Sequence, residues 1–369
     1  MPIHSFQDLA APSIKGLQTY QPGKPIDELQ RQLGLTDIIK LASNENPLGP
    51  SERVKQVIRE SMADISRYPD GNGFYLKQAL AEKIGVEITM VTLGNGSNDV
   101  LDVIARVFLT VGREAIYSEH AFVVYGLSTQ AVGATARVAS AKDYGHNLQA
   151  MQALVNENTS VVFIANPNNP TGTWLEANEL EAFIKALPAH VIVVLDEAYG
   201  EYLDPSEAPK SIVFLKKYPN VIITRTFSKA YGLAGLRVGY ALSQPGVADL
   251  LNRVRHPFNV NSLGLVAAQE ALNDQAYIDQ SRLLNRQGMQ QLEQGFKRLK
   301  LKYIPSVANF ITVEIGPKAG EVYLALLQEG VIVRPVTGYQ LPHHLRVSIG
   351  LSNENTSCLD ALEKVLQRV

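Results

Sequence analysis

Residues 161–195 read VVFIANPNNPTGTWLEANELEAFIKALPAHVIVVL, and this stretch decides the fold. It begins and ends with unbroken apolar runs, Val161–Ala165 and Val191–Leu195, which are typical of strands buried on both faces. Residues 175–187 between them have the composition and periodicity of a helix. A third apolar run, Val221–Thr224, starts thirty residues after the second. This spacing predicts βαβ units and therefore a parallel α/β sheet.

The pattern changes on both sides of this region. Upstream, a strand-like stretch at 88–93 leads through a glycine turn into a helical run at 99–108. Beyond about residue 255, long helices are expected at 263–272 and 277–299, with strand pieces at 310–313, 331–333 and 346–349. We therefore expect an N-terminal arm (1–35), a large domain with a mostly parallel sheet flanked by helices (36–260) and a smaller α+β C-terminal domain (261–369).

The composition argues against several classes of function. The 369 residues carry 34 Lys and Arg against 36 Asp and Glu, so no overall positive field would gather nucleic acid or an anionic membrane. No apolar window is long enough for a membrane helix, and residues 1–20 lack the pattern of an export signal. The single cysteine, Cys358, cannot form an internal disulfide and favours a reducing cytoplasm. We predict no metal site, because the seven histidines are scattered.

Polar and titratable residues follow each of the three apolar runs. NPNNPTG (166–172) follows the first, Asp196 and Tyr199 follow the second, and Lys229 follows the third. The carboxyl ends of parallel strands meet at one edge of a sheet, where α/β proteins bind their ligands. These residues are therefore expected to converge on one site.

Each of these residues could have either a purely structural role or a chemical one. Asp196 alone could cap a helix, but at the mouth of an apolar strand it could pair with a protonated pyridine nitrogen. Lys229 could be a surface lysine, but near Phe227 and Arg237 its ammonium would be disfavoured and its amine freed as a nucleophile. The glycine turn 94–98 could hold a phosphate at the start of the following helix. Together these are the groups that pyridoxal phosphate requires.

Three motifs in this order carry a resemblance to a known superfamily: NPNNPTG (166–172), DEAY (196–199) and TFSKAYGLAGLRVG (226–239). They resemble the motifs of the fold-type-I pyridoxal-phosphate enzymes of the aspartate aminotransferase superfamily. Other stretches, spread over nearly the whole chain, resemble the histidinol-phosphate aminotransferases within it. These are YQPGKP (20–25), ASNENPLGP (42–50), RYPDG (67–71), GNGSNDVLD (94–102), HAFVVY (120–125), VRPV (333–336) and LRVSIG (345–350).

The resemblance implies pyridoxal 5′-phosphate as cofactor and a role for each matching residue. Lys229 corresponds to the lysine that bonds to the cofactor aldehyde and later moves the substrate α-proton, and Asp196 to the carboxylate that keeps the pyridine nitrogen protonated. Asn169 and Tyr199 correspond to the partners of the phenolic oxygen. Phe122 takes the place of the ring that stacks on the cofactor. The expected phosphate cup consists of Ser97, Asn98, Thr226, Ser228 and Arg237.

The resemblance also implies how the subunits share their sites and which residues bind the substrates. Tyr68 resembles a phosphate-binding tyrosine lent by a neighbouring subunit, which implies a homodimer with shared sites. Arg346 corresponds to the arginine that holds the carboxylate of glutamate or 2-oxoglutarate. Tyr20, Asn44 and Arg334 are candidates for the second substrate, although Tyr20 could simply pack, Asn44 could cap a turn and Arg334 could end a surface strand.

The expected reaction is transamination of L-histidinol phosphate with 2-oxoglutarate, which gives imidazole-acetol phosphate and glutamate in histidine biosynthesis. An aromatic amino-acid aminotransferase shares nearly all of these parts and is the near alternative. A decarboxylating lyase of the threonine-phosphate type uses the same cofactor set on a phosphorylated amino acid. A non-enzymatic regulator with this fold would carry an added DNA-binding segment, which the sequence before residue 50 does not resemble.

Overall fold

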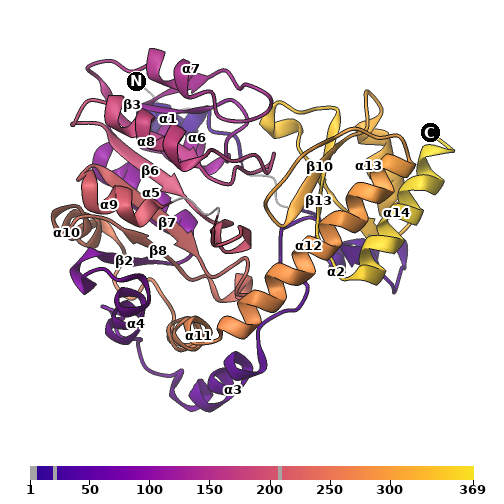
Figure 1. The fold of residues 1–369 in the computed structure, drawn as a ribbon, viewed down its shortest axis with the longest axis horizontal. Coiled ribbons are helices and arrows are strands. Elements are labelled where there is room, and N and C mark those ends of the chain that lie inside the picture. Colours follow the sequence, from indigo (N-terminus) through magenta and orange to yellow (C-terminus); the bar gives the residue numbers. More distant parts are fainter. Residues whose placement is uncertain (1–5, 20–22, 207–209) are drawn as a thin grey trace.

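The computed structural model describes residues 6–19, 23–206 and 210–369. A seven-stranded sheet forms the centre of the larger lobe, in the order β2-β8-β7-β6-β5-β3-β4 (Figure 1). Its strands are β2 (Val91–Gly94), β3 (Glu114–Ser118), β4 (Thr135–Ala139), β5 (Thr159–Ala165), β6 (Ile192–Asp196), β7 (Val221–Thr226) and β8 (Gly239–Leu242). β8 is antiparallel to both of its neighbours, and the remaining pairs are parallel. The predicted mostly parallel α/β sheet is confirmed.

The central strands are buried on both faces because successive residues point into two different cores. In β5, Val162 and Ile164 enter one core, and Val161 and Phe163 enter the other. The first core is covered by α3 (Glu52–Ser61), α4 (Phe74–Ile84), α7 (Leu148–Ala153), α8 (Ala177–Ala186), α9 (Ser211–Lys217) and α11 (Ser262–Leu272). The second is covered by α5 (Ser97–Phe108), α6 (Val124–Ala131) and α10 (Pro245–Val254). The same alternation at the end of β6 turns Asp196 toward α5 and α6 and turns the next residue, Glu197, to the opposite face.

The smaller lobe is built on a four-stranded antiparallel sheet in the order β12-β13-β10-β9. Its strands are β9 (Tyr303–Ile304), β10 (Phe310–Glu314), β12 (Arg334–Pro335) and β13 (His344–Ser348). Three helices pack with it around a separate core, namely α12 (Gln275–Arg298), α13 (Ala319–Gln328) and α14 (Ser352–Leu366). α12 connects the lobes, since Ile278 near its start lies in the core of the larger lobe and Phe296 near its end in that of the smaller (Figure 1).

The N-terminal region contacts both lobes. Helix α2 (Ile26–Leu33) buries Leu29 against Leu327 and Ile332, and it lies beside the C-terminal helices in Figure 1. Strand β1 (Ile39–Lys40) then pairs in parallel with β11 (Val331–Ile332). The first described segments are the 3₁₀ turn η1 (Phe6–Leu9) and the short helix α1 (Pro12–Lys15), which lies beside α6. The domain limits at residues 35 and 260 stay predictions.

Sequence periodicity located most elements to within a few residues. The helices expected at 175–187, 263–272 and 277–299 correspond to α8, α11 and α12. The strand expected at 88–93 is wrong in its first half, because Ile88–Met90 forms a 3₁₀ turn (η3) and β2 begins at Val91. The remaining 3₁₀ turns are η2 (Met62–Asp64), η4 (Gly200–Tyr202), η5 (Ala234–Leu236) and η6 (Thr337–Tyr339).

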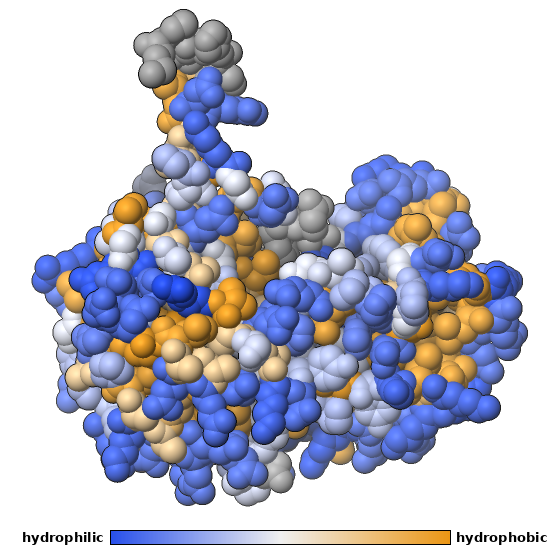
Figure 2. Space-filling model, turned by 90° about the horizontal axis from the view of Figure 1, so that it is seen from above, coloured by the Kyte–Doolittle hydropathy of each residue, from blue (hydrophilic) through white to orange (hydrophobic). Residues whose placement is uncertain are grey.

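The molecular surface is mainly hydrophilic in the view of Figure 2, with hydrophobic patches on both lobes. Within the described part of the chain, no helix combines the length and the apolar character that a membrane span requires.

Candidate active site

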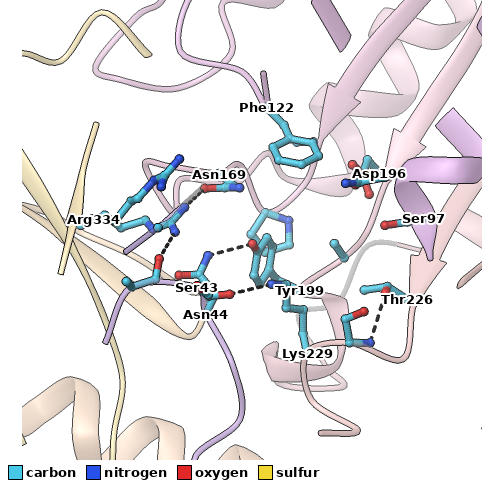
Figure 3. A pocket seen from close by; sticks show the side chains of 18 of the residues that line it. Ser43, Asn44, Ser97, Phe122, Asn169, Asp196, Tyr199, Thr226, Lys229 and Arg334 are labelled. Carbon is cyan, nitrogen blue, oxygen red and sulfur yellow. Dashed lines mark hydrogen bonds between the residues drawn. The ribbon is translucent and has the colours of Figure 1, made fainter. Parts of the chain in front are cut away.

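A pocket of about 180 Å³ lies at the carboxyl ends of β5, β6 and β7, where the lobes meet. It is lined by most of the residues that the sequence analysis singled out (Figure 3). These are Asn44, Ser97, Asn98, Phe122, Asn169, Asp196, Tyr199, Thr226, Ser228, Lys229, Arg237, Arg334 and Arg346. The expected convergence on one sheet edge is therefore observed, while the role of each residue stays a prediction.

Asp196 is held rigidly at the floor of the pocket. Its side chain is only 5% exposed, and each carboxylate oxygen accepts a hydrogen bond from a buried hydroxyl. The Tyr125 hydroxyl donates to Oδ2 at 2.8 Å and the Thr224 hydroxyl donates to Oδ1 at 3.1 Å. Burial raises the pKa of the Asp196 carboxyl to about 6, although these two hydrogen bonds lower it. A cation next to this carboxylate would relieve the cost of burying its charge.

Lys229 enters the pocket from the loop after β7. Its Nζ donates to the backbone oxygen of Ser43 at 3.0 Å and lies 5.8 Å from the centre of the Tyr199 ring. Burial, together with the nearby charge of Arg346, lowers the pKa of the Lys229 ammonium to about 7. A substantial share of this lysine is therefore a neutral amine near pH 7, which is the form that reacts with an aldehyde.

The residues expected at the phenolic oxygen and over the ring surround this lysine. In Figure 3, Phe122 and Lys229 lie on opposite sides of the pocket, with Tyr199 and Asn169 between them. The Phe122 ring is held edge-on against Tyr125, with ring centres 5.9 Å apart. The Tyr199 ring packs edge-on against Phe310 of β10, with centres 5.2 Å apart. Elements of both lobes thus support the pocket walls.

A cradle for an anion forms where α5 begins. Ser97 and Asn98 occupy the first turn of this twelve-residue helix, whose free N–H groups and dipole attract a phosphate. Arg237 has a left-handed backbone (φ 57°) and its guanidinium reaches toward the same point. Glycine at position 96 (φ 84°) leaves room for this approach, because a Cβ there would collide with the Arg237 guanidinium where it now lies. The hydroxyls of Thr226 and Ser228 also line this end.

Two arginines occupy the side of the pocket that the smaller lobe provides. Arg346, on β13, is 5% exposed and donates to the side-chain oxygen of Asn169 and to the backbone oxygen of Ala42. Arg334, on β12, pairs directly with Arg346 across the sheet. Two guanidinium groups side by side suit a substrate that carries two anionic groups, such as a dicarboxylate.

One of the expected residues, Tyr68, does not line this pocket. Tyr68 is 84% exposed and stacks on Phe258, with ring centres 4.8 Å apart. It does not line the pocket of its own chain, so its role as a residue lent to a second subunit stays a prediction. Tyr20 lies outside the described residues.

The sequence analysis did not identify several residues that support or line the pocket. Tyr125 and Thr224 hold Asp196, and Ala42 and Ser43 offer backbone oxygens to Arg346 and Lys229. Tyr339, in η6, is a further lining residue. Thr224 was foreseeable, because its register places it beside Asp196 on the neighbouring strand. The backbone contacts carry no signal in the residue types, because any amino acid has a carbonyl.

The side chains that line the pocket match the chemical groups of pyridoxal phosphate. The cradle at α5, the lysine with a lowered pKa and the buried carboxylate with two fixed donors suit a phosphate, an aldehyde and a ring nitrogen respectively. The described residues contain no group of three or more His, Cys, Asp or Glu side chains that could hold a metal ion.

Comparisons with known proteins agree with this geometry. The family model for aminotransferases of class I and II matches residues 36–362. The chain is 59% identical to histidinol-phosphate aminotransferase 2 of Pseudomonas fluorescens strain Pf-5, over 98% of this chain and 99% of that protein. It is 58% identical to the protein of the same name from Pseudomonas aeruginosa strain PAO1, over 99% of each.

A solved structure is similar to this chain over nearly its full length. The histidinol-phosphate aminotransferase from Sinorhizobium meliloti, crystallised in complex with pyridoxal-5′-phosphate, superposes with a TM-score of 0.91 at 32% identity, over 97% of this chain and 98% of that one. The fold is therefore that of the fold-type-I pyridoxal-phosphate aminotransferases. From the family match and this likeness over the full length, the chain belongs to the class I and II aminotransferases and, within them, to the histidinol-phosphate aminotransferase family.

Proposed function

We propose that this chain is a pyridoxal-phosphate-dependent aminotransferase that transfers the amino group of L-histidinol phosphate to 2-oxoglutarate, giving imidazole-acetol phosphate and L-glutamate in histidine biosynthesis. The main support for this reaction is that Lys229, Asp196 and the anion cradle at α5 line the same pocket. The choice of substrate rests on the names of the relatives that are more than half identical to it.

Each of these residues would then have a distinct role in transamination. When bound, the cofactor would supply an electron-withdrawing ring and would store the amino group between the two substrates. Lys229 would hold the cofactor covalently, and its freed amine would take the proton from the substrate α-carbon and return it. Asp196 would keep the ring nitrogen protonated, while Asn169 and Tyr199 would bond to the phenolic oxygen.

The arginines would select the substrates. Arg346 would hold one carboxylate of glutamate or 2-oxoglutarate through two parallel N–H groups. Arg334 would receive the second carboxylate of these substrates or the phosphate of L-histidinol phosphate, which is the one anionic group of that substrate. Phosphate and carboxylate both present pairs of oxygen atoms that match the fork of a guanidinium. One pair of cationic groups could thus serve both half-reactions.

A half-reaction screen tests this proposal. The protein loaded with pyridoxal phosphate is mixed with one amino donor at a time, and the visible absorbance is followed as the cofactor takes the amino group. We expect L-histidinol phosphate and L-glutamate to convert the cofactor at much higher kcat/KM than phenylalanine, since phenylalanine lacks the phosphate of the first and the second carboxylate of the other, which are the groups that Arg334 would hold. Preference for phenylalanine would indicate an aromatic aminotransferase. Release of carbon dioxide from threonine phosphate would indicate a lyase.

Loading of the cofactor should depend on pH because of Lys229. Only the neutral amine attacks an aldehyde, and the pKa of this lysine is about 7. The group is therefore mostly protonated below pH 7 and mostly neutral above it. Mixing cofactor-free protein with pyridoxal phosphate should give a loading rate that rises about tenfold between pH 6 and 8 and then levels off. A rate that keeps rising up to pH 10 would indicate an ordinary, solvated lysine.

We also propose a cytoplasmic homodimer. A second subunit is supported by a group of exposed aromatic side chains at one end of the larger lobe, namely Tyr68, Phe74, Tyr75 and Phe258. Large apolar side chains gathered at the surface mark association sites. The reducing compartment is supported by Cys358, a buried free thiol.

Shared sites predict complementation between two damaged subunits. Tyr68→Ala should weaken cofactor retention at the site of the partner subunit, and Lys229→Ala should inactivate the site of its own subunit. In a hybrid dimer both changes would fall on one site and leave the other intact. Mixing and refolding the two variants should therefore restore about half of the activity per hybrid, measured after separation by differential tags. No recovery in the hybrid would exclude a site built from two subunits.

A further inference from the structure

Asn44 lies between the two lobes in a conformation that requires support. It follows β1, is 1% exposed and has a left-handed backbone with φ 54°. A residue with a side chain adopts this region only at a cost, so the surrounding contacts must hold it. The backbone oxygen of Asn44 accepts a hydrogen bond from the Asn309 amide at 3.0 Å, and its N–H donates to the Ser348 hydroxyl at 2.8 Å. The smaller lobe therefore fixes this residue.

Its side chain links the smaller lobe to Tyr199. The Asn44 Nδ2 donates to the Tyr199 hydroxyl oxygen at 2.9 Å, and Oδ1 accepts from the Ser348 hydroxyl at 3.0 Å (Figure 3 shows the contact with Tyr199). Both ends of the amide thus have partners, one from β13 and one from the loop after β6.

The hydrogen bonds have a defined direction. Ser348 already accepts from the backbone N–H of Asn44, so its own proton is available for Oδ1. With Oδ1 turned to Ser348, the amide presents Nδ2 to Tyr199 as a donor. The Tyr199 oxygen then accepts one hydrogen bond, and its own O–H is left to donate a hydrogen bond elsewhere. A phenol that accepts a hydrogen bond also becomes a better donor, because the bonds of a chain polarise one another.

We infer that Asn44 is a positioning residue, which, oriented by Ser348, turns the hydroxyl proton of Tyr199 toward the phenolic oxygen of the bound cofactor. The role differs from the substrate contact that the resemblance implies for Asn44. The inference rests on the proposed function, because it assumes that the cofactor occupies this pocket. It also makes the smaller lobe part of the cofactor site, since Ser348 lies on β13.

The substitution Asn44→Asp tests this directly. It keeps the shape of the side chain and replaces the donor by an acceptor, so Tyr199 would donate to position 44 in place of the cofactor. A donor to the phenolic oxygen stabilises its anionic form, and loss of that donor should raise the pH at which the lysine-bound cofactor changes its visible absorbance. We expect a rise of about one pH unit or more. Other charged groups that act on Lys229 are Arg346, Glu45, Arg237 and Lys40, and all remain in the variant.

A double substitution separates positioning from the added charge. Asn44→Asp is repeated with Tyr199→Phe, in which the hydroxyl is absent. If Asn44 acts through Tyr199, the shift caused by Asn44→Asp should shrink to less than about a third of its value in the presence of Tyr199. An undiminished shift in the Tyr199→Phe background would mean that the new carboxylate acts on the cofactor by charge alone, and this would overturn the inference.

Ser348 gives an independent test that adds no charge. Ser348→Ala should produce a smaller rise in the same absorbance titration, and Ser348→Thr, which keeps a hydroxyl, should restore the wild-type value. An Asn44→Asp variant that folds and binds the cofactor without any shift would overturn the inference while leaving the proposed function intact. Wild-type protein that forms no lysine-bound cofactor at all would overturn both.

Discussion

Lys229→Ala should abolish turnover, with a fall in kcat/KM of at least about 10⁴-fold. The substitution removes the nucleophile and the proton carrier together, and general-base catalysis alone contributes roughly 10²–10⁴-fold. Bound pyridoxal phosphate should keep its place in the anion cradle but lose the visible absorbance of the lysine-bound form. The measurement is the rate of glutamate formation from 2-oxoglutarate with L-histidinol phosphate, together with the absorbance spectrum.

The loss should not come from unfolding. The Lys229 side chain donates a hydrogen bond to the Ser43 carbonyl, and burial already disfavours its charge. Its removal should therefore leave the melting temperature of the cofactor-free protein within a few degrees of wild type. Lys83→Ala is the matched control, because burial also lowers the pKa of Lys83 and its Nζ donates to the Leu272 carbonyl, away from the pocket. The control should keep most of its activity. Comparable losses in the two variants would contradict a special role for Lys229.

The carboxyl edge of the sheet could be predicted because it depends on short stretches of sequence. Three β-branched runs define β5, β6 and β7, and in a parallel sheet the residues that follow each run must meet at the same edge. The order of the motifs along the chain is therefore enough to bring Asn169, Asp196 and Lys229 together. Local pattern and topology were sufficient for this part of the site.

The supports of the site could not be predicted because they depend on contacts between distant segments. Tyr125 reaches Asp196 across 71 positions of the chain, and Ser348 reaches Asn44 across 304. The packing of α2 on the smaller lobe is of the same kind, since Leu29 meets Leu327 and Ile332 only after the chain has folded. Nothing in the local periodicity around these residues distinguishes them from other core positions.

Asp196→Asn should lower kcat about 10³-fold while it stabilises the cofactor-free protein. A neutral amide cannot hold the ring nitrogen in its protonated form, so the ring would lose most of its power to withdraw electrons from the substrate. The structure should tolerate the change, because the hydroxyls of Tyr125 and Thr224 can each donate or accept. Activity and stability should therefore move in opposite directions.

The stability gain has a defined pH dependence. The pKa of Asp196 is raised from 3.8 to about 6 in the folded protein, so the folded state binds more protons than the unfolded state between these pH values. The contribution of Asp196 to stability consequently falls as the pH rises from about 4 to 6, and its burial penalty is fully present above 6. Asp196→Asn should raise the melting temperature at pH 8 and have little effect at pH 4, as measured by calorimetry without cofactor.

The adjacent carboxylate provides the control, because it faces the other side of the sheet. Glu197 is 4% exposed and pairs with Arg225 at 2.8 Å, so Glu197→Gln would leave a largely buried guanidinium without its anion. Breaking such a pair costs about 3–5 kcal/mol. We therefore expect Glu197→Gln to lower stability strongly and kcat only modestly, the reverse of Asp196→Asn. Opposite effects of the two substitutions on kcat and stability would show that Asp196 serves the reaction and that Glu197 stabilises the fold. Loss of both kcat and stability in each variant would instead mean that Asp196 has a structural role.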